Sequence, residues 1–366
     1  MTEIKDISAL SSESLVLELS DIFGPTGCED RVLQSIFAEA KRLCDKTVMD
    51  KMGNVIARIS LGNSEERKRV MLSAHTDEVG FMIEEIKNDG TLTFGCLGGI
   101  DPSVVAGRRV RVGNERTLTT GIICSKAIHH KSKSERKSAV DCDKLYIDIG
   151  CQSREDAEKV VSVGDFATFD STPYLFGKDN RTLKSKALDD RMGCALLIEL
   201  MRRINEERPS LDLDIYFCFT VREETGYSGA FVTAERILPD FALIFESTAV
   251  GDLPEAPSNK RVAELGAGAV ISVADRSTIY DKELIDLAFA TAKKCGIALQ
   301  VKRYLSGGND AGHIHKSGVG VRSLAISIPT RYLHSPSCVA SLDDYESARD
   351  IAFALLENID RLENKR

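Results

Sequence analysis

The chain has 366 residues, of which 43% are hydrophobic, so it can bury a large core and exceeds one ordinary domain. Its formal net charge of -8 argues against a general nucleic-acid-binding protein, because such proteins carry a basic face for phosphates. The N-terminus lacks the features of a signal peptide, and no run reaches the roughly 18 apolar residues of a membrane span. We therefore expect a soluble protein of two domains, with no nucleic-acid or membrane partner.

The ten cysteines lie between Cys28 and Cys338 without a CxxC pair, and several fall inside apolar runs. This usage is typical of buried free thiols in a reducing compartment, and it does not suit a disulfide framework or a zinc-thiolate site. The sequence therefore predicts a cytoplasmic protein.

The first part of the chain predicts helices followed by strands. Helical periodicity runs from Leu15 to Leu43 on either side of "GPTGCED", whose acidic residues suit a helix start. The runs "NVIARIS" and "RVMLSAH" follow, and the second is an almost unbroken apolar strand that ends at His75. Such runs are typical of buried parallel strands.

Residues 77–173 have a different texture. Runs such as "LTFGCLGGI", "GRRVRVG" and "TLTTGIICS" are short, β-rich and separated by glycine and charge, and no long helical period lies among them. We expect a small inserted β domain here, with residues 1–76 and 174–366 forming the main domain. The one basic cluster, residues 129–138, is expected to be a solvated loop.

The rest of the chain alternates apolar strands and helices. "LDLDIYFCFTV" predicts a buried strand, helices are expected near Lys282 to Cys295 and from about Leu342 to Leu362, and "ALDDRMGCALLIELMRRI" places two aspartates before an apolar helix. This alternation predicts an α/β fold with a mostly parallel sheet flanked by helices.

Acids and histidines fall where the predicted strands end. In open α/β sheets, ligands bind outside the carboxyl ends of the strands, so these side chains are expected to meet at one edge. The candidates at strand ends and at one helix start are His75, Asp189, Asp190, Glu223, Glu224, Glu246 and His334. Taken alone, each has a structural explanation, such as a hydrogen-bonded histidine or acids at a helix start. Their occurrence together favours a metal site.

Five of these residues could serve two metal ions. If one carboxylate bridges, each ion receives three protein ligands, which is the pattern of a catalytic site. The five candidate ligands are His75, Asp189, Glu224, Glu246 and His334. The glutamate pair in "TVREETGY" then has a purpose, because one glutamate can bind a metal while the other acts as general base toward a water whose pKa a metal lowers to about 7. The predicted chemistry is metal-assisted hydrolysis.

The motifs also resemble those of a known family. "SAHTDEVGFMI", "ALDDRMG", "VREETGYSGA", "ESTAVGDLP" and "IPTRYLHSP" occur in the order found in the dinuclear-metal aminopeptidases, which include glutamyl, lysyl and deblocking aminopeptidases and assemble as tetrahedral dodecamers. "GGIDPSVVAGRRV" and "SGGNDAGHIH" also match, so the resemblance covers nearly the whole chain. Related deacylases and carboxypeptidases usually insert their small domain after the glutamate pair, whereas here about a hundred β-rich residues precede it.

The resemblance implies roles for these residues. It places His75, Asp189 and Glu246 on one metal, and Asp189, Glu224 and His334 on the other, with Glu223 as the general base. Asp77 would orient the imidazole of His75, and Asp190 would lie beside the metals without ligating them, although the sequence itself does not separate Asp189 from Asp190. The family most often has aspartate at the position of Glu246, so the spacing of the metals or the metal preferred can differ here.

The resemblance further implies a dinuclear metallo-exopeptidase fold and a PDZ-like inserted domain that contributes to oligomer assembly. It implies zinc or cobalt, and mixed histidine and carboxylate ligands also fit manganese. The substrate side chain is expected near the loop that contains Asp310 and near Arg331. Arg331 would either favour acidic substrates or form a structural salt bridge.

The expected protein is a cytoplasmic aminopeptidase that removes N-terminal residues from peptides. An N-acyl-amino-acid deacylase would use the same two-metal site. A glycosidase could use paired acids, but the chain has no tryptophan and only 6% aromatic residues for stacking on sugars. A non-catalytic oligomeric scaffold is the alternative from another class, and the complete ligand set argues against it.

Overall fold

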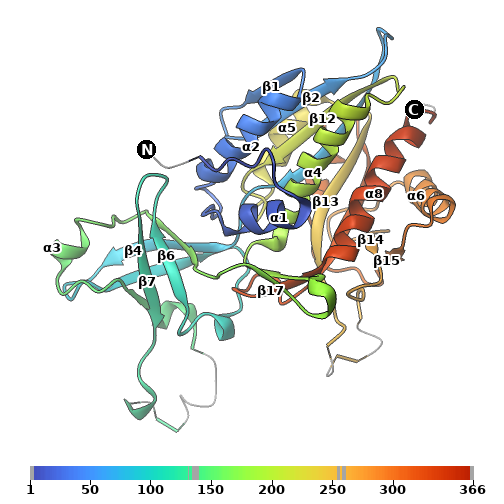
Figure 1. Ribbon diagram of the computed structural model, residues 1–366. Helices are drawn as coiled ribbons and strands as arrows, with labels where there is room; N and C mark the ends of the chain where they lie inside the picture. Colours follow the sequence, from blue (N-terminus) through green and yellow to red (C-terminus); the bar gives the residue numbers. More distant parts are fainter. Residues whose placement is uncertain (1–3, 131, 134–139, 254–255, 258–260, 363–366) are drawn as a thin grey trace.

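The computed structural model describes residues 4–130, 132–133, 140–253, 256–257 and 261–362. It consists of a wide layered part around a large sheet and a smaller part around a β-barrel (Figure 1). Of the basic cluster predicted to be a solvated loop, residues 131 and 134–138 lie outside the described residues. Within the described ranges, no helix combines the length and apolar character needed to cross a membrane.

The large sheet forms the centre of the layered part. Its strands, in their order across the sheet, are β1 (Lys46–Met49), β2 (Val55–Ser60), β12 (Leu213–Thr220), β3 (Lys68–His75), β13 (Phe241–Ala249), β16 (Arg322–Arg331), β17 (Cys338–Ser341), β11 (Thr182–Ser185) and β10 (Tyr174–Phe176). Two further strands, β14 (Ala269–Ile271) and β15 (Leu299–Val301), attach to β16. The strands β12, β3, β13 and β16 are mutually parallel, whereas the outer pairs are antiparallel. The predicted parallel arrangement therefore holds for the centre, and the sheet as a whole is mixed.

Helices cover both faces of the sheet, as the nearly unbroken apolar strands predict. Alternate residues of β3 point to opposite faces, so Leu72 joins one core while Met71 joins another. The first core is closed by α1 (Ser12–Asp21), α2 (Asp30–Leu43), α4 (Leu188–Glu207), α6 (Lys282–Cys295) and α8 (Leu342–Ile359), and the second by α5 (Ser228–Ile237) and α7 (Ala311–Ile314). Figure 1 shows α4 and α8 crossing the near side of the sheet.

The barrel is built from residues between the two halves of the layered part. Its strands close in the order β4 (Gly80–Ile86), β5 (Leu92–Leu97), β8 (Tyr146–Asp148), β7 (Leu118–Cys124), β6 (Arg109–Gly113) and β9 (Phe166–Phe169), and one short helix, α3 (Arg154–Ala157), accompanies them. The ring of Phe81 meets those of Phe94 and Phe169 edge to face, with centroids 4.9 and 5.4 Å away. All six strands fall inside the segment that the sequence predicts to be an inserted β domain.

Buried polar contacts join the barrel to the layered part. Glu78 accepts a hydrogen bond from Thr168 of β9 at 2.8 Å and pairs with Lys186, which is 1% exposed. The guanidinium of Arg191, also buried, donates to four backbone carbonyl groups between residues 19 and 76. A buried charge is costly unless it is paired and hydrogen-bonded. Glu78 and Lys186 therefore join the barrel to the chain just before α4, whereas Arg191 fastens the start of α4 to the layered part.

Candidate metal centre

The candidate residues meet at the carboxyl edge of the parallel strands. His75 is the last residue of β3 and lies beside Thr220, the last residue of β12. The chain turns immediately afterwards, because Arg222 has a left-handed φ of 58°. This turn brings Glu223 and Glu224 to His75, and one oxygen of each lies within 4.8 Å of a histidine ring nitrogen.

Three other segments deliver the remaining candidates. Asp189 and Asp190 open α4 with non-helical backbone angles, and the peptide bond between them is cis. His334 follows β16 in a turn where its own φ is 58°. Glu246 differs from the sequence expectation: it lies inside β13, because this strand continues its pairing with β16 as far as Ala249.

The geometry is organised around Asp189. Its Oδ1 lies 3.5 Å from Nε2 of His75, and its Oδ2 lies 3.3 Å from Nε2 of His334. A second carboxylate accompanies each histidine, Glu246 at 3.7 Å from His75 and Glu224 at 3.2 Å from His334. Asp189 is thus placed as a carboxylate between two three-residue clusters, His75–Asp189–Glu246 and Asp189–Glu224–His334.

The donor set fits two divalent cations. Within the described residues, oxygens of Asp189, Glu224 and Glu246 are buried without a hydrogen-bond donor. Buried carboxylates require a compensating charge or hydrogen bond, and two histidine nitrogens with three carboxylates match the ligand preferences of zinc, cobalt and manganese. We conclude that the cluster is suited to hold metal ions.

The electrostatics of the cluster also favour the binding of cations. Burial and the neighbouring carboxylates raise the pKa values of Glu223 and Glu246 well above the ordinary value for a glutamate. Burial lowers the pKa of His334, but the adjacent carboxylates of Asp189 and Glu224 outweigh this effect and raise the pKa to about 11. Without cations, protons would therefore compensate the acids, and two divalent ions would take over that role.

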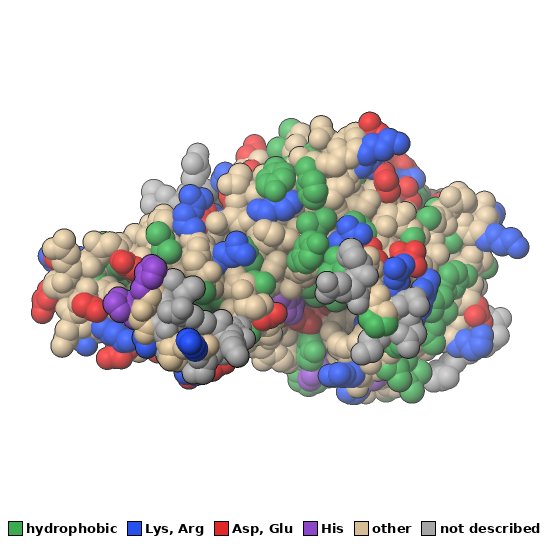
Figure 2. All heavy atoms as spheres, turned by 90° about the horizontal axis from the view of Figure 1, so that it is seen from below, with side chains coloured by type: hydrophobic (Ala, Val, Ile, Leu, Met, Phe, Trp, Pro, Cys, Tyr) green, Lys and Arg blue, Asp and Glu red, His purple; other side chains and the backbone are tan. Residues whose placement is uncertain are grey.

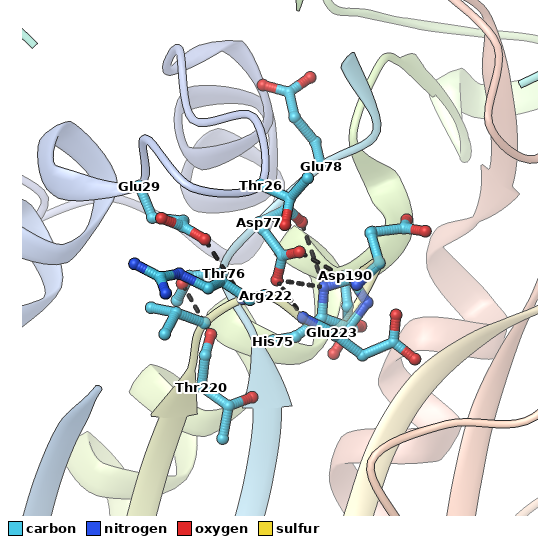
Figure 3. Close-up of polar contacts among 12 residues, drawn as sticks. Thr26, Glu29, His75, Thr76, Asp77, Glu78, Asp190, Thr220, Arg222 and Glu223 are labelled. Carbon is cyan, nitrogen blue, oxygen red and sulfur yellow. Dashed lines mark hydrogen bonds and ion pairs between the residues drawn. The ribbon is translucent and has the colours of Figure 1, made fainter. Parts of the chain in front are cut away.

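Backbone carbonyl groups that contact Nδ1 orient the rings of His75 and His334. Nδ1 of His75 lies 3.1 Å from the carbonyl oxygen of Asp77 and 3.4 Å from its Oδ1 (Figure 3). Nδ1 of His334 lies 2.7 Å from the carbonyl oxygen of Gly99. These contacts leave Nε2 of both rings directed at Asp189, as a metal-binding imidazole requires. Gly99 was not predicted from the sequence, and no local pattern marks a backbone carbonyl for this role.

The other predicted site residues lie at the margin of the cluster or outside it. Asp190 is fully buried and accepts a hydrogen bond from the backbone of Gly193 at 3.0 Å. Asp310, 1% exposed, accepts from Thr220 at 2.7 Å. Arg331 is engaged by Asp252 in a two-pronged ion pair with both distances at 2.8 Å, which is the structural salt bridge that the sequence left as an alternative.

A cleft of about 340 Å³ adjoins the cluster at His334. Asp101, Val104 and Arg108 line it from the barrel part, and residues 332–337 line it from the layered part. Figure 2 shows the molecule from below, with a histidine beside acidic side chains near the middle of this face, and basic and acidic groups interspersed around it. The cleft lies between the two parts of the molecule and reaches the cluster at His334.

Comparisons with known proteins match the chain over most of its length. The model of the M42 glutamyl aminopeptidase family matches residues 53–351. A relative from Acetivibrio thermocellus is 37% identical over 91% of this chain and 95% of its own length. The lysyl aminopeptidase of Pyrococcus furiosus is 30% identical over 92% of this chain and 94% of its own length.

Solved structures are similar over the same extent. The TET aminopeptidase of the marine sediment archaeon Thaumarchaeota archaeon SCGC AB-539-E09 superposes with a TM-score of 0.90 at 35% identity, covering 96% of both chains. The TET1 peptidase of Pyrococcus horikoshii, which can assemble into a tetrahedron or a large octahedral shell, has a TM-score of 0.82 at 32% identity, covering 94% of this chain and 99% of its own.

Proposed function

The chain belongs to the M42 glutamyl aminopeptidase family, and on that premise we propose that this metal-dependent aminopeptidase removes N-terminal residues from peptides with Glu223 as its general base. The single observation that carries the site assignment is the position of Asp189, whose two oxygens face His75 and His334 at 3.5 and 3.3 Å. In this position the carboxylate of Asp189 could bridge two metal ions. The other four ligands would then be shared equally between the two ions.

The proposed ligands are His75, Asp189 and Glu246 for one ion, and Asp189, Glu224 and His334 for the other. When bound, the ions would supply Lewis-acid polarisation of the scissile carbonyl and a water of lowered pKa. Zinc or cobalt is proposed on the family resemblance, and manganese fits the same ligands.

The side chain of Glu223 would transfer the proton of the attacking water. Glu223 lies in the cluster with its carboxylate near His75 and is 8% exposed. A carboxylate held next to the attacking water can take its proton and later donate a proton to the nitrogen of the leaving amine.

We propose further that the chain forms a homo-oligomer, a dodecamer by analogy with its relatives, to which the barrel contributes contacts. A structure of a related TET1 peptidase contains a dodecamer. A cytoplasmic location is proposed as well, supported by ten cysteines that are all free thiols in the structure.

The experiment that tests this function compares two forms of one peptide, with a free and with an acetylated N-terminus. We expect stepwise release of residues from the free form only. Release of an acetyl group from the blocked form, with the free form untouched, would contradict the proposal in favour of the deacylase.

A further inference from the structure

The turn that carries Glu223 has an unusual set of hydrogen-bond acceptors. Four consecutive backbone N–H groups, those of residues 221–224, donate to side chains and not to a neighbouring strand. The pairs are Val221 to Oδ1 of Asn54 at 3.0 Å, Arg222 to Oε1 of Glu29 at 3.2 Å, Glu223 to Oδ1 of Asp77 at 3.0 Å, and Glu224 to Oδ2 of Asp77 at 3.1 Å. The acceptors come from three segments that are far apart in the sequence.

The turn needs these partners because Val221 and Glu223 are buried, on either side of the exposed Arg222. Arg222 is held in a left-handed conformation, which is unfavourable for a residue with a side chain. A buried N–H group without a hydrogen-bond partner destabilises the folded chain. The conformation therefore depends on acceptors supplied from outside the strand.

The neighbouring helix is shaped to admit one of these acceptors. A Cβ atom at Gly229, in the first turn of α5, would lie 2.4 Å from Oδ1 of Asn54 and 2.4 Å from the carbonyl oxygen of Val221. Gly229 also donates its own N–H to that carbonyl at 3.1 Å. Only glycine permits this approach, so helix, turn and Asn54 form one tightly packed unit.

Glu29 is itself well anchored. It is 5% exposed, and its Oε1 also accepts a hydrogen bond from the backbone of Gly27 at 2.9 Å. In the same loop, the hydroxyl of Thr26 lies 3.0 Å from that of Thr225, just beyond the glutamate pair. Figure 3 shows Glu29 reaching Arg222 on the side of the turn opposite to His75. Glu29 thus contacts the backbone of the turn and none of the proposed metal ligands.

We propose that Glu29 and Asn54 are positioning residues for the general base: they hold the backbone of residues 221 and 222 so that the carboxylate of Glu223 meets the attacking water in the reactive orientation. This inference rests on the proposed function, in which Glu223 is the base. It differs from the role of Asp77, which also orients His75. The acceptors act through the turn and touch no reacting atom.

The first test replaces Glu29 by alanine and by glutamine. Because small displacements of a reacting group cost large factors in rate, we expect Glu29→Ala to lower kcat by about 10- to 100-fold while KM and the metal content remain as in the wild type. Glu29→Gln retains an acceptor oxygen and should restore kcat to within about threefold of the wild type. Unchanged kcat in Glu29→Ala, or no rescue by glutamine, would overturn the inference.

A control and a second variant guard against a simple loss of fold. Asp240 accepts the backbone N–H of Arg69 at 2.8 Å at the opposite end of the sheet, so Asp240→Ala should lower stability without changing kcat. Asn54→Ala removes the acceptor of Val221, together with the hydrogen bond that Nδ2 of Asn54 donates to Asp50 at 2.8 Å, and should reproduce the loss of kcat at full metal content. Loss of metal in Asn54→Ala would show a general structural role and overturn the proposal.

The decisive measurement is a double-mutant cycle with Glu223→Gln. If Glu29 acts through Glu223, adding Glu29→Ala to Glu223→Gln should cost less than about twofold in kcat, because the group it positions is already disabled. A further loss equal to that of the single variant would overturn the inference. Near-normal turnover of Glu223→Gln by itself would instead overturn the proposed function, so the two failures are distinguishable.

Discussion

The carbonyl oxygen of Gly99, in the segment that forms the barrel, lies 2.7 Å from the ring Nδ1 of His334 in the layered part. The ring therefore presents Nε2 to Asp189 and Glu224. One half of the candidate metal centre is thus oriented by the inserted segment. The segment that forms the barrel therefore contributes directly to the candidate metal centre.

Crowding this loop should weaken the ion held by His334. A Cβ atom at Gly98 would lie 2.7 Å from Val79 and 3.3 Å from Oε2 of Glu224, so Gly98→Ala should lower metal affinity at that position by about 10- to 100-fold. Gly107 offers a matched control, because it has the same φ of 81° but nothing within 4 Å of its Cβ position. Metal titration followed by calorimetry checks this, and equal effects of the two substitutions would refute the role of the loop.

Neighbouring glutamates should respond differently to the same substitution. Glu223→Gln removes the proposed base but no proposed ligand, so two metals should remain while turnover falls by about 10²- to 10⁴-fold. Glu224→Gln removes a ligand that faces His334 at 3.2 Å and should reduce the metal content. Elemental analysis and steady-state kinetics of both variants measure this, and metal loss in Glu223→Gln with retention in Glu224→Gln would reverse the assignment.

Asp189 and His334 should differ in how many ions they hold. Asp189 belongs to both ligand clusters and His334 to one. We expect Asp189→Asn to lose both ions and His334→Ala to retain one. Elemental analysis after dialysis gives the count directly, and full metal content in Asp189→Asn would exclude it as the shared ligand.

Arg331 should not determine substrate preference. Its guanidinium is held by Asp252 at 2.8 Å on two nitrogens, which leaves the charge compensated. Arg331→Met should therefore change kcat/KM for glutamyl and leucyl substrates by the same factor. A selective loss toward the glutamyl substrate would contradict this and assign Arg331 to the pocket.

Asp344 should make stability depend on pH. Burial raises the pKa of this carboxyl to about 6, although the N–H groups of Gly266 and Gly268 donate to it at 2.7 and 2.6 Å. Since the folded pKa is raised above the unfolded value of 3.8, the contribution is fully present below that value and is lost as pH rises through 6.

Replacing Asp344 by asparagine keeps a neutral side chain at every pH. The stability of Asp344→Asn relative to the wild type should therefore rise between pH 4 and 7, by about 1–3 kcal/mol. Urea denaturation at both values measures the difference. A difference in stability that does not vary with pH would show that folding leaves the pKa of Asp344 unchanged, and would contradict this prediction.

Features with a local signature could be predicted from the sequence. His75 ends an apolar strand and the glutamate pair follows another, and both stand at the carboxyl edge of the parallel strands. The sequence predicts that Glu246 ends its strand, because the apolar run stops there. The strand is in fact longer, since β13 continues to pair with β16 for three more residues. The antiparallel outer strands were not foreseen, since strand direction depends on partners elsewhere in the chain.

No local sequence pattern marks the contacts between residues that are far apart in the chain. Glu29 stands in "GPTGCED", where an acid is explained by the start of α2, yet it accepts from Arg222, 193 positions away. Gly99 and His334 are separated by 235 positions. Only the packing of loops, helices and barrel around the sheet reveals these partners.

The central claim is that the protein releases residues from the N-terminus of peptides and requires two metal ions, held by this cluster, to do so. The most direct measurement is the metal content per chain of the purified protein, combined with release of free amino acids from a peptide pool before and after chelation. We expect two ions per chain, loss of release on chelation and its return when zinc, cobalt or manganese is added. No bound metal and no release after any of these ions is supplied would contradict the account.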